Sequence, residues 1–269
     1  MIELDPAVIK KLVKSDKRLD GRNFDAYRKV EIEKDFIKSA EGSARVKLGN
    51  TVIVAGIKMS IGTPYPDTPA EGVLVVNAEL VPFASPEFER GPPGEDAIEL
   101  ARVVDRAIRE SKCIDFSKLC IEPNKAVWMV NVDMDVLDDD GNLIDASCLA
   151  AVAAIMSARL PEYENVNDGY VVKFGTKTSK KIPMMNIPVS TTSIKINDAI
   201  LADPSIEEIS AMEARLTIGT LNSGSDIKLC SMQKGGERGL TFEEVEKMID
   251  IAVERGKELR DALIDAVGE

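Results

Sequence analysis

Residues 125–160 read KAVWMVNVDMDVLDDDGNLIDASCLAAVAAIMSARL, and this stretch decides the fold. Its first part, Lys125 to Leu137, has the apolar positions of a β-strand, and residues 138–142 form a turn. Asp145 to Leu160 is a helix of mostly Ala, Val, Ile and Met, which stops before Pro161. A helix that is apolar on nearly all sides must be covered by other elements. The stretch therefore predicts a strand, a turn and a buried central helix.

The chain on either side of this unit predicts two similar halves. The N-terminal arm, residues 1–26, carries a short helix from Ala7 to Lys14. Strands are expected at residues 27–34, 43–48, 51–59 and 73–81, and again at residues 187–196, 200–203, 213–220 and 225–232. Thr241 and Glu244 form a capping box that starts a long closing helix, which ends near Val267.

These elements divide the chain into a first half, residues 27–161, and a second half, residues 180–269. Residues 162–179 are polar and loop-rich and are expected to link the halves within one compact unit. In each half the strands come first and a helix follows, which predicts an internally duplicated α+β fold.

Composition excludes several kinds of chemistry. The 269 residues include no histidine, so Ser-His-Asp catalysis, histidine bases and histidine metal ligands are absent. The four cysteines are far apart and never form a Cys-x-x-Cys pair, so no zinc site or other metal site is expected. The DDDG turn lacks the spacing of a calcium loop, because its earlier ligand position is Val136. No cofactor is expected either.

The N-terminus and the hydropathy point to the cytoplasm. Met1 to Pro6 has no basic-then-apolar signal pattern, and no apolar run approaches the roughly 18 residues of a membrane span. The net charge of −12 makes binding of nucleic acid over the whole surface improbable, although a local cationic site is compatible with it.

A cationic stripe of this kind is predicted in the helix at residues 94–112. Arg102, Arg106 and Arg109 fall within about 60° of one another on one helix face, where they could bind a polyanion. The apolar positions lie on the opposite face: Ala97, Leu100, Ala101, Val104, Ala107 and Ile108. The alternative is a solvated face with internal ion pairs, Glu99 with Arg102 and Arg106 with Glu110.

Four segments in this order resemble the RNase PH family, and within it the non-catalytic RNase PH-like ring subunit of the archaeal exosome. They are Arg18-Leu19-Asp20-Gly21-Arg22, the arginine helix, the unit at residues 127–160, and Val189 to Asp203. The resemblance implies an RNase PH-like fold (ribosomal protein S5 domain 2-like), with two pseudo-symmetric β-α-β-α halves, antiparallel or mixed sheets and covering helices. The family reaction is phosphorolysis, in which phosphate attacks the 3′-terminal linkage of RNA.

The chain departs from the active members of the family at two places. In active members the Asp-Gly turn continues as Gly, then Ser or Thr, then Arg, whereas here Asn142, Leu143 and Ile144 follow Gly141. Active members also carry two aspartates six residues apart; Asp203 fits the first, but the second position is Ile209. The hydroxyl, the guanidinium and one carboxylate of the active pattern are missing, so the chain is predicted to have no catalytic residues and not to be an enzyme.

The resemblance also implies the partners of this chain. It would pair with a catalytic RNase PH-like exosome subunit, and three such heterodimers would close a hexameric ring with trimeric S1/KH-type RNA-binding cap proteins. Arg102, Arg106 and Arg109 would bind single-stranded RNA for the neighbouring active site.

Two alternatives to this function remain. The chain could itself be a phosphate-dependent 3′–5′ exoribonuclease that uses Asp203 and the nearby Glu207 and Glu208, or it could be a scaffold without RNA contact. The turn near the N-terminus carries the basic residues Lys17, Arg18 and Arg22, which could contact phosphates or a partner. Alternatively, Asp20 could hold this turn together, and the sequence does not decide between these roles.

Overall fold

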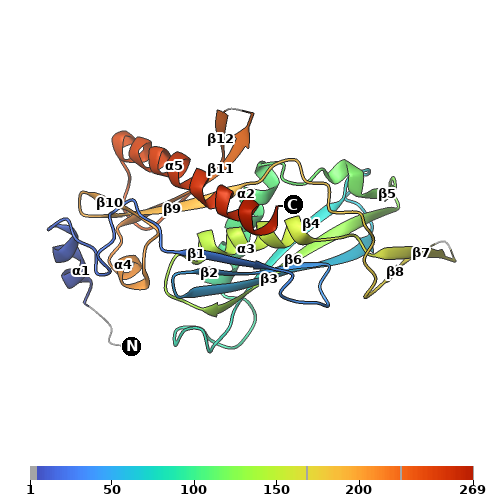
Figure 1. Cartoon of the computed structure of the whole chain (residues 1–269), viewed down its shortest axis with the longest axis horizontal. Helices are drawn as coiled ribbons and strands as arrows, with labels where there is room; N and C mark the ends of the chain where they lie inside the picture. The colour runs from blue at the N-terminus through green and yellow to red at the C-terminus, as the bar shows by residue number, and fades with distance from the viewer. Residues whose placement is uncertain (1–4, 168, 225, 269) are drawn as a thin grey trace.

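A computed structural model of the chain describes residues 5–167, 169–224 and 226–268. The first four residues of the predicted arm and residues 168 and 269 lie outside this part. So does Ser225, the predicted first residue of a strand. Figure 1 shows two sheets with helices packed between and over them.

The first half of the chain forms a mixed sheet in the order β1-β2-β3-β6-β4 (Figure 1). Its strands are β1 (Val30–Lys34), β2 (Gly42–Leu48), β3 (Thr51–Gly62), β4 (Val73–Leu80) and β6 (Ala126–Asp138), with the short β5 (Cys120–Glu122) paired to β6. Neighbouring strands are antiparallel, except that β4 runs parallel to β6. The parallel pair requires a crossover, and the chain between the two strands includes the helix α2 (Glu95–Glu110).

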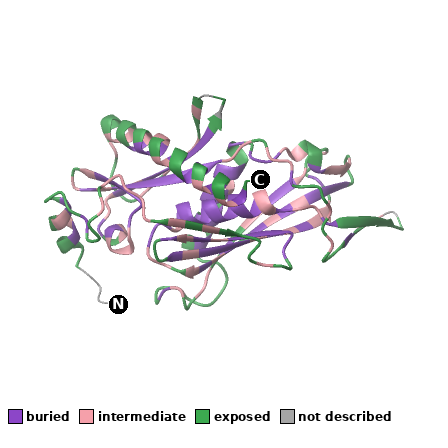
Figure 2. Cartoon of the chain, viewed as in Figure 1, coloured by how far each residue is buried: buried purple, intermediate pink, exposed green. Residues whose placement is uncertain are grey.

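The helix α3 (Leu143–Ser157) forms the centre of the molecule. It packs against β2 and β3 of the first sheet and against β9 (Val189–Ile196) of the second. Every residue from Ile144 to Ile155 is buried, as the purple core of Figure 2 shows. This confirms the covered central helix that its apolar composition predicts.

The second half forms an antiparallel sheet in the order β10-β9-β11-β12, with β10 at Ala199–Ala202, β11 at Ala214–Ser223 and β12 at Asp226–Gly235. The short helix α4 (Ile206–Ser210) follows β10. The closing helix α5 (Phe242–Val267) begins at the predicted capping box, because the Thr241 hydroxyl accepts from Glu244 N and the Glu244 carboxylate accepts from Thr241 N. Its apolar face packs on β9 and β11.

Two predicted boundaries differ for identifiable reasons. The strand expected from residue 27 begins only at Val30, because Arg28 N donates to the Asp203 carboxylate at 2.8 Å instead of to a neighbouring strand. The central helix ends at Ser157 rather than at Leu160. There, Arg159 N donates to Glu41 O, and Arg159 forms a β-bridge with Lys181.

The segment predicted as a loop-rich linker contains a hairpin. Strands β7 (Glu162–Val166) and β8 (Gly169–Lys173) pair with each other, and the Tyr163 ring makes edge contacts with the rings of Trp128 and Tyr170. All five residues of β7 are exposed, so no alternation of buried and exposed positions signals a strand. The remaining elements are the N-terminal helix α1 (Pro6–Val13) and a 3₁₀ turn at Phe116–Leu119.

Candidate functional site

Helix α2 holds the predicted arginine stripe in place. All six predicted apolar positions are buried, together with Val103, and they fix α2 against β4 and α3. The side chains of Arg102, Arg106 and Arg109 are exposed on the opposite face. The amphipathic pattern therefore gives the correct orientation of the helix.

The three arginines are not equivalent. Arg109 forms an ion pair with Asp105 at 2.7 Å and donates to Leu74 O, and the Asp105 carboxylate raises the pKa of Arg109. Arg102 and Arg106 have no hydrogen bond or ion pair to any residue that the structure describes. The stripe therefore presents two guanidiniums that are free to bind a ligand, those of Arg102 and Arg106. The charge of the third, on Arg109, is partly neutralised by Asp105.

The ion pairs that the sequence offers as the alternative do not form. Glu99 contacts Arg215 of β11 rather than Arg102, and the i,i+4 pair of the helix joins Asp105 to Arg109 rather than Arg106 to Glu110. In Asp105–Arg109 the acid precedes the base, which is the order that the helix dipole favours. Arg215 is a contact that sequence reasoning missed, because it comes from a strand more than 100 residues away.

The second feature is the turn before α3. Gly141 and Asn142 both adopt left-handed backbone conformations, with φ of 84° and 54°. The Asn142 Nδ2 donates to Asp145 Oδ2 and to Asp203 Oδ1, each at 2.8 Å. Its two amide hydrogens thus bridge two buried carboxylates from different halves of the chain.

Asp145 occupies the first turn of α3 and is fully buried. Burial raises its pKa to about 6, against hydrogen bonds from Tyr27, Asn142 and Thr192 that lower it. The amino end of a buried helix is a place where an anion is stabilised. Here the chain's own carboxylate takes that place.

Asp203 is enclosed by arginines. Burial alone would raise its pKa, but the hydrogen bonds and charge of Arg28 hold that pKa below its ordinary value. Arg22 Nη1 adds a further contact at 2.8 Å. Asp203 is therefore kept ionised and saturated with donors. Nothing in the local sequence signals Arg28, which is 175 residues away.

Of the charged residues that the sequence left undecided, Arg18 and Arg22 have structural partners, whereas the exposed Lys17 side chain has no hydrogen bond or ion pair to a described residue. Arg18 is buried, pairs with Glu208 at 2.6 Å and donates to the carbonyls of Ala202 and Asp203. Arg22 contacts both Asp20 and Asp203. These contacts tie the N-terminal arm to the second half of the chain and leave Arg18 unable to reach a ligand.

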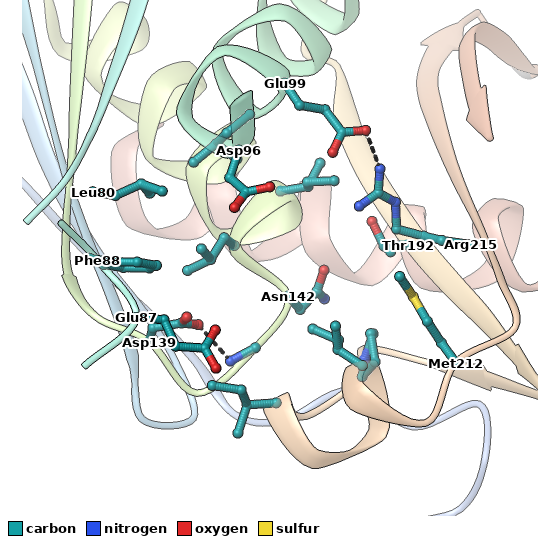
Figure 3. Close-up of a pocket in the computed structure, with 17 residues that line it drawn as sticks. Leu80, Glu87, Phe88, Asp96, Glu99, Asp139, Asn142, Thr192, Met212 and Arg215 are labelled. Atoms are coloured by element: carbon teal, nitrogen blue, oxygen red, sulfur yellow. Dashed lines mark hydrogen bonds and ion pairs between the residues drawn. The ribbon is translucent and has the colours of Figure 1, made fainter. Parts of the chain in front are cut away.

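The residues that depart from the active pattern meet at one pocket (Figure 3). Asn142, Leu143, Ile144 and Ile209 all line it, although Ile209 is more than 60 residues from the turn. Four carboxylates also line the pocket, those of Glu87, Asp96, Glu99 and Asp139. Among the described lining residues Arg215 is the one base, and it is already paired with Glu99 at 2.5 Å.

Other kinds of site have no support in the described part of the chain. No group of three or more acidic or cysteine side chains there is placed to hold a metal ion. Burial raises the pKa of the Cys148 thiol to about 12, so this thiol is a poor nucleophile. Within the same residues, no helix is both long and apolar enough to cross a bilayer.

Comparison with known proteins identifies the class. The model for domain 1 of the 3′ exoribonuclease family (RNase PH) matches residues 26–161, and the model for domain 2 matches residues 186–255. The chain therefore belongs to this 3′ exoribonuclease family, and the predicted RNase PH-like fold is confirmed.

Two archaeal proteins are similar to this chain over most of its length. The chain is 46% identical over 258 residues to the exosome complex component Rrp42 of Thermococcus gammatolerans, covering 96% of this chain and 93% of the relative. It is 48% identical over 255 residues to Rrp42 of Archaeoglobus fulgidus, covering 94% and 93%.

Solved structures agree with this assignment. A chain in the Archaeoglobus fulgidus exosome with RNA bound to the active site superimposes with a TM-score of 0.85 at 47% identity, over 95% of this chain and 96% of that one. The rice (Oryza sativa) Rrp46 structure, at 18% identity and a TM-score of 0.67 over 91% of this chain and 98% of that one, shares the fold.

Proposed function

We propose that this chain is a non-catalytic component of an archaeal exosome, a complex that degrades RNA from the 3′ end by phosphorolysis. It pairs with a catalytic RNase PH-like subunit, and three such pairs close a hexameric ring that carries trimeric S1/KH-type cap proteins. The similarity to Rrp42 proteins and to a chain of an RNA-bound archaeal exosome supports a place in such a complex. We further propose that the complex acts in the cytoplasm.

The charge of the pocket at the Asn142 turn is the observation that carries the non-catalytic role. Phosphorolysis needs bound inorganic phosphate, and phosphate needs uncommitted cationic or N–H donors. This pocket offers four carboxylates and one guanidinium that is already paired. A phosphate anion there would be repelled and would have little to replace its lost hydration.

Asp203 gives independent support for the absence of catalysis. A general acid must carry a proton near neutral pH, but the arginines around Asp203 hold it in the charged form. The nearby Glu208 is paired with the buried Arg18, and Glu207 accepts from the Ser205 hydroxyl. The carboxylates that an active enzyme would use are therefore already held by ion pairs and hydrogen bonds within the chain.

The RNA contact is assigned to the outer face of α2. Arg102 and Arg106 are exposed and uncommitted among the described residues, and a guanidinium can bind a phosphate through two parallel hydrogen bonds. Arg109 shares the face, but its pairing with Asp105 reduces what it can contribute. RNA held here would be presented to the active site of the neighbouring subunit.

The catalytic part is tested by incubating RNA and phosphate with the chain alone, with the catalytic partner alone and with both. We expect release of nucleoside diphosphates only when the partner is present, and faster release from the assembled ring. Phosphate-dependent release by the chain alone, abolished by Asp203→Asn, would establish it as an enzyme instead.

The RNA contact is tested in the assembled ring with Arg102→Gln/Arg106→Gln. Each lost phosphate contact on single-stranded RNA should make the dependence of log affinity on log salt shallower by about 0.7, so the double variant should lose about 1.4. The control is Lys247→Gln/Lys257→Gln, which removes the same charge from the exposed side of α5. An unchanged affinity and slope for the arginine variant would favour a scaffold without RNA contact.

A further inference from the structure

The pocket at the Asn142 turn has a volume of about 250 Å³ and walls of mixed character. Apolar side chains line it on more than one side: Leu80, Phe88, Leu100, Ile206, Ile209 and Met212. Its polar lining comes from α2, from the loop before α2, from the turn before α3, and from Thr192 of β9 and Arg215 of β11 (Figure 3). A space of this size holds a small organic group rather than a single ion.

The charges around the pocket are unbalanced. Glu87, Asp96 and Asp139 have no ion pair with any described residue, and the one guanidinium that lines the pocket is paired with Glu99. Burial, together with the charges of Asp140 and Glu87, raises the pKa of Asp139, against a hydrogen bond from Gly141 N that lowers it. A cation in this space would stabilise these carboxylates in their ionised form.

Asn142 provides an independent observation that points to a ligand. Only 3% of this residue is exposed, and both hydrogens of its amide are used by Asp145 and Asp203, which fixes the orientation of the amide. Its Oδ1 receives no hydrogen bond from the described residues. Figure 3 shows this oxygen turned into the pocket. A buried acceptor without a donor costs stability, so the site favours a ligand that carries N–H groups.

We propose that this pocket binds a cation on an apolar stem, an alkylguanidinium or alkylammonium group. The stem packs against the apolar side chains of the lining, the charged head lies among Glu87, Asp96 and Asp139, and one N–H donates to Asn142 Oδ1. The group is either a free small molecule or the side chain of an arginine or lysine from an adjacent subunit. Binding of a free cation by the isolated chain does not require the ring, whereas a side chain of an adjacent subunit reaches the pocket only in the assembly.

The test is calorimetric titration of the purified full chain with n-butylguanidinium, with its neutral isostere n-butylurea, and with inorganic phosphate. We expect n-butylguanidinium to bind at least tenfold more tightly than n-butylurea, and phosphate not to compete. Equal binding of n-butylurea, or competition by phosphate, would overturn the proposal.

Charge-removing variants locate the binding. Asp96→Asn/Glu87→Gln removes two exposed rim charges, and we expect it to weaken n-butylguanidinium binding by about five- to tenfold, as for partly exposed ion pairs. The matched control, Glu110→Gln/Glu246→Gln, removes two exposed charges that do not line the pocket. An equal loss in the control would show that the cation responds only to net charge and would contradict the site.

The same titration on the assembled ring separates the two sources. If n-butylguanidinium binds the chain alone but not the ring, a side chain of an adjacent subunit fills the pocket. If it binds both equally, the ligand is a free small molecule. Failure to bind in either state would overturn the proposal, while leaving the non-catalytic role to be decided by the release assay.

Discussion

Asp145 and Asp203 are two buried carboxylates joined by one amide, yet they ionise differently. Asp203 faces the guanidiniums of Arg22 and Arg28, whose charges offset the cost of burial. Asp145 receives hydrogen bonds from Tyr27, Asn142 and Thr192, which are all neutral. Neutral donors stabilise a buried charge less than an opposite charge does, so burial remains the larger effect at Asp145.

This difference predicts a pH dependence of stability. Because the pKa of Asp145 is about 6 in the folded protein and 3.8 when unfolded, the folded state binds more protons between these values. The contribution of Asp145 to the free energy of unfolding should therefore fall as pH rises from about 4 to 6. The expected loss is on the order of 3 kcal/mol. Urea unfolding of wild type and Asp145→Asn across this range should differ in slope, with the wild type losing more stability. Equal slopes would show that Asp145 ionises normally.

Single residues of the sequence locate the departures from the active pattern, but they do not predict the contacts around those positions. The departures at residues 142–144 and at Ile209 are visible in the chain, and the structure places these residues around one pocket. Arg28 and Arg215, which neutralise Asp203 and Glu99, could not be predicted. Their partners are more than 100 residues away, and no local spacing encodes such a contact.

Among the elements, the helices were predicted most accurately. The apolar face of α2 and the buried α3 follow from a periodicity and a composition that run through several turns. The hairpin β7–β8 was missed because it makes few buried contacts and is held by backbone pairing and aromatic edges. Periodicity reports burial, so it identifies exposed elements poorly.

The turn that starts α3 is the element most sensitive to substitution. At Gly141, φ is 84°, and an added Cβ would lie 2.6 Å from Ile206 N. We expect Gly141→Ala to lower the free energy of unfolding by about 2 kcal/mol or more, through backbone strain and the clash with α4. Gly239→Ala is the control, because no described atom lies within 4 Å of its added Cβ. Similar urea midpoints for the two variants would contradict this account of the turn.

At the scale of the whole molecule, polar contacts join the two halves across the core. Arg28 of the first half pairs with Asp203 of the second, and the Thr192 hydroxyl of the second half donates to Asp145 of the first. The ion pair of Arg18 with Glu208 adds the N-terminal arm to this network. Helix α3 packs against strands of both sheets. Separating the halves would expose α3 and break buried charge pairs, which is costly.

The two halves should therefore unfold in one step. Trp128, the one tryptophan of the sequence, is buried in β6 of the first half, so its fluorescence reports that half. The 26 residues of α5 contribute much of the helical circular dichroism of the second half. We expect the two signals to give the same urea midpoint. Midpoints that differ beyond error would mean that the halves are independent units.

The bridge at Asn142 also limits how this chain can change over generations. Any side chain without two well-placed hydrogens leaves Asp145 or Asp203 with one donor fewer, and a buried acceptor without its donor lowers stability. A single substitution toward an anion-binding loop would thus weaken the protein before it gained any affinity for phosphate. Formation of a phosphate-binding loop here would need the bridge, its two carboxylates and the acidic rim to change together, so substitution one residue at a time is constrained at this turn.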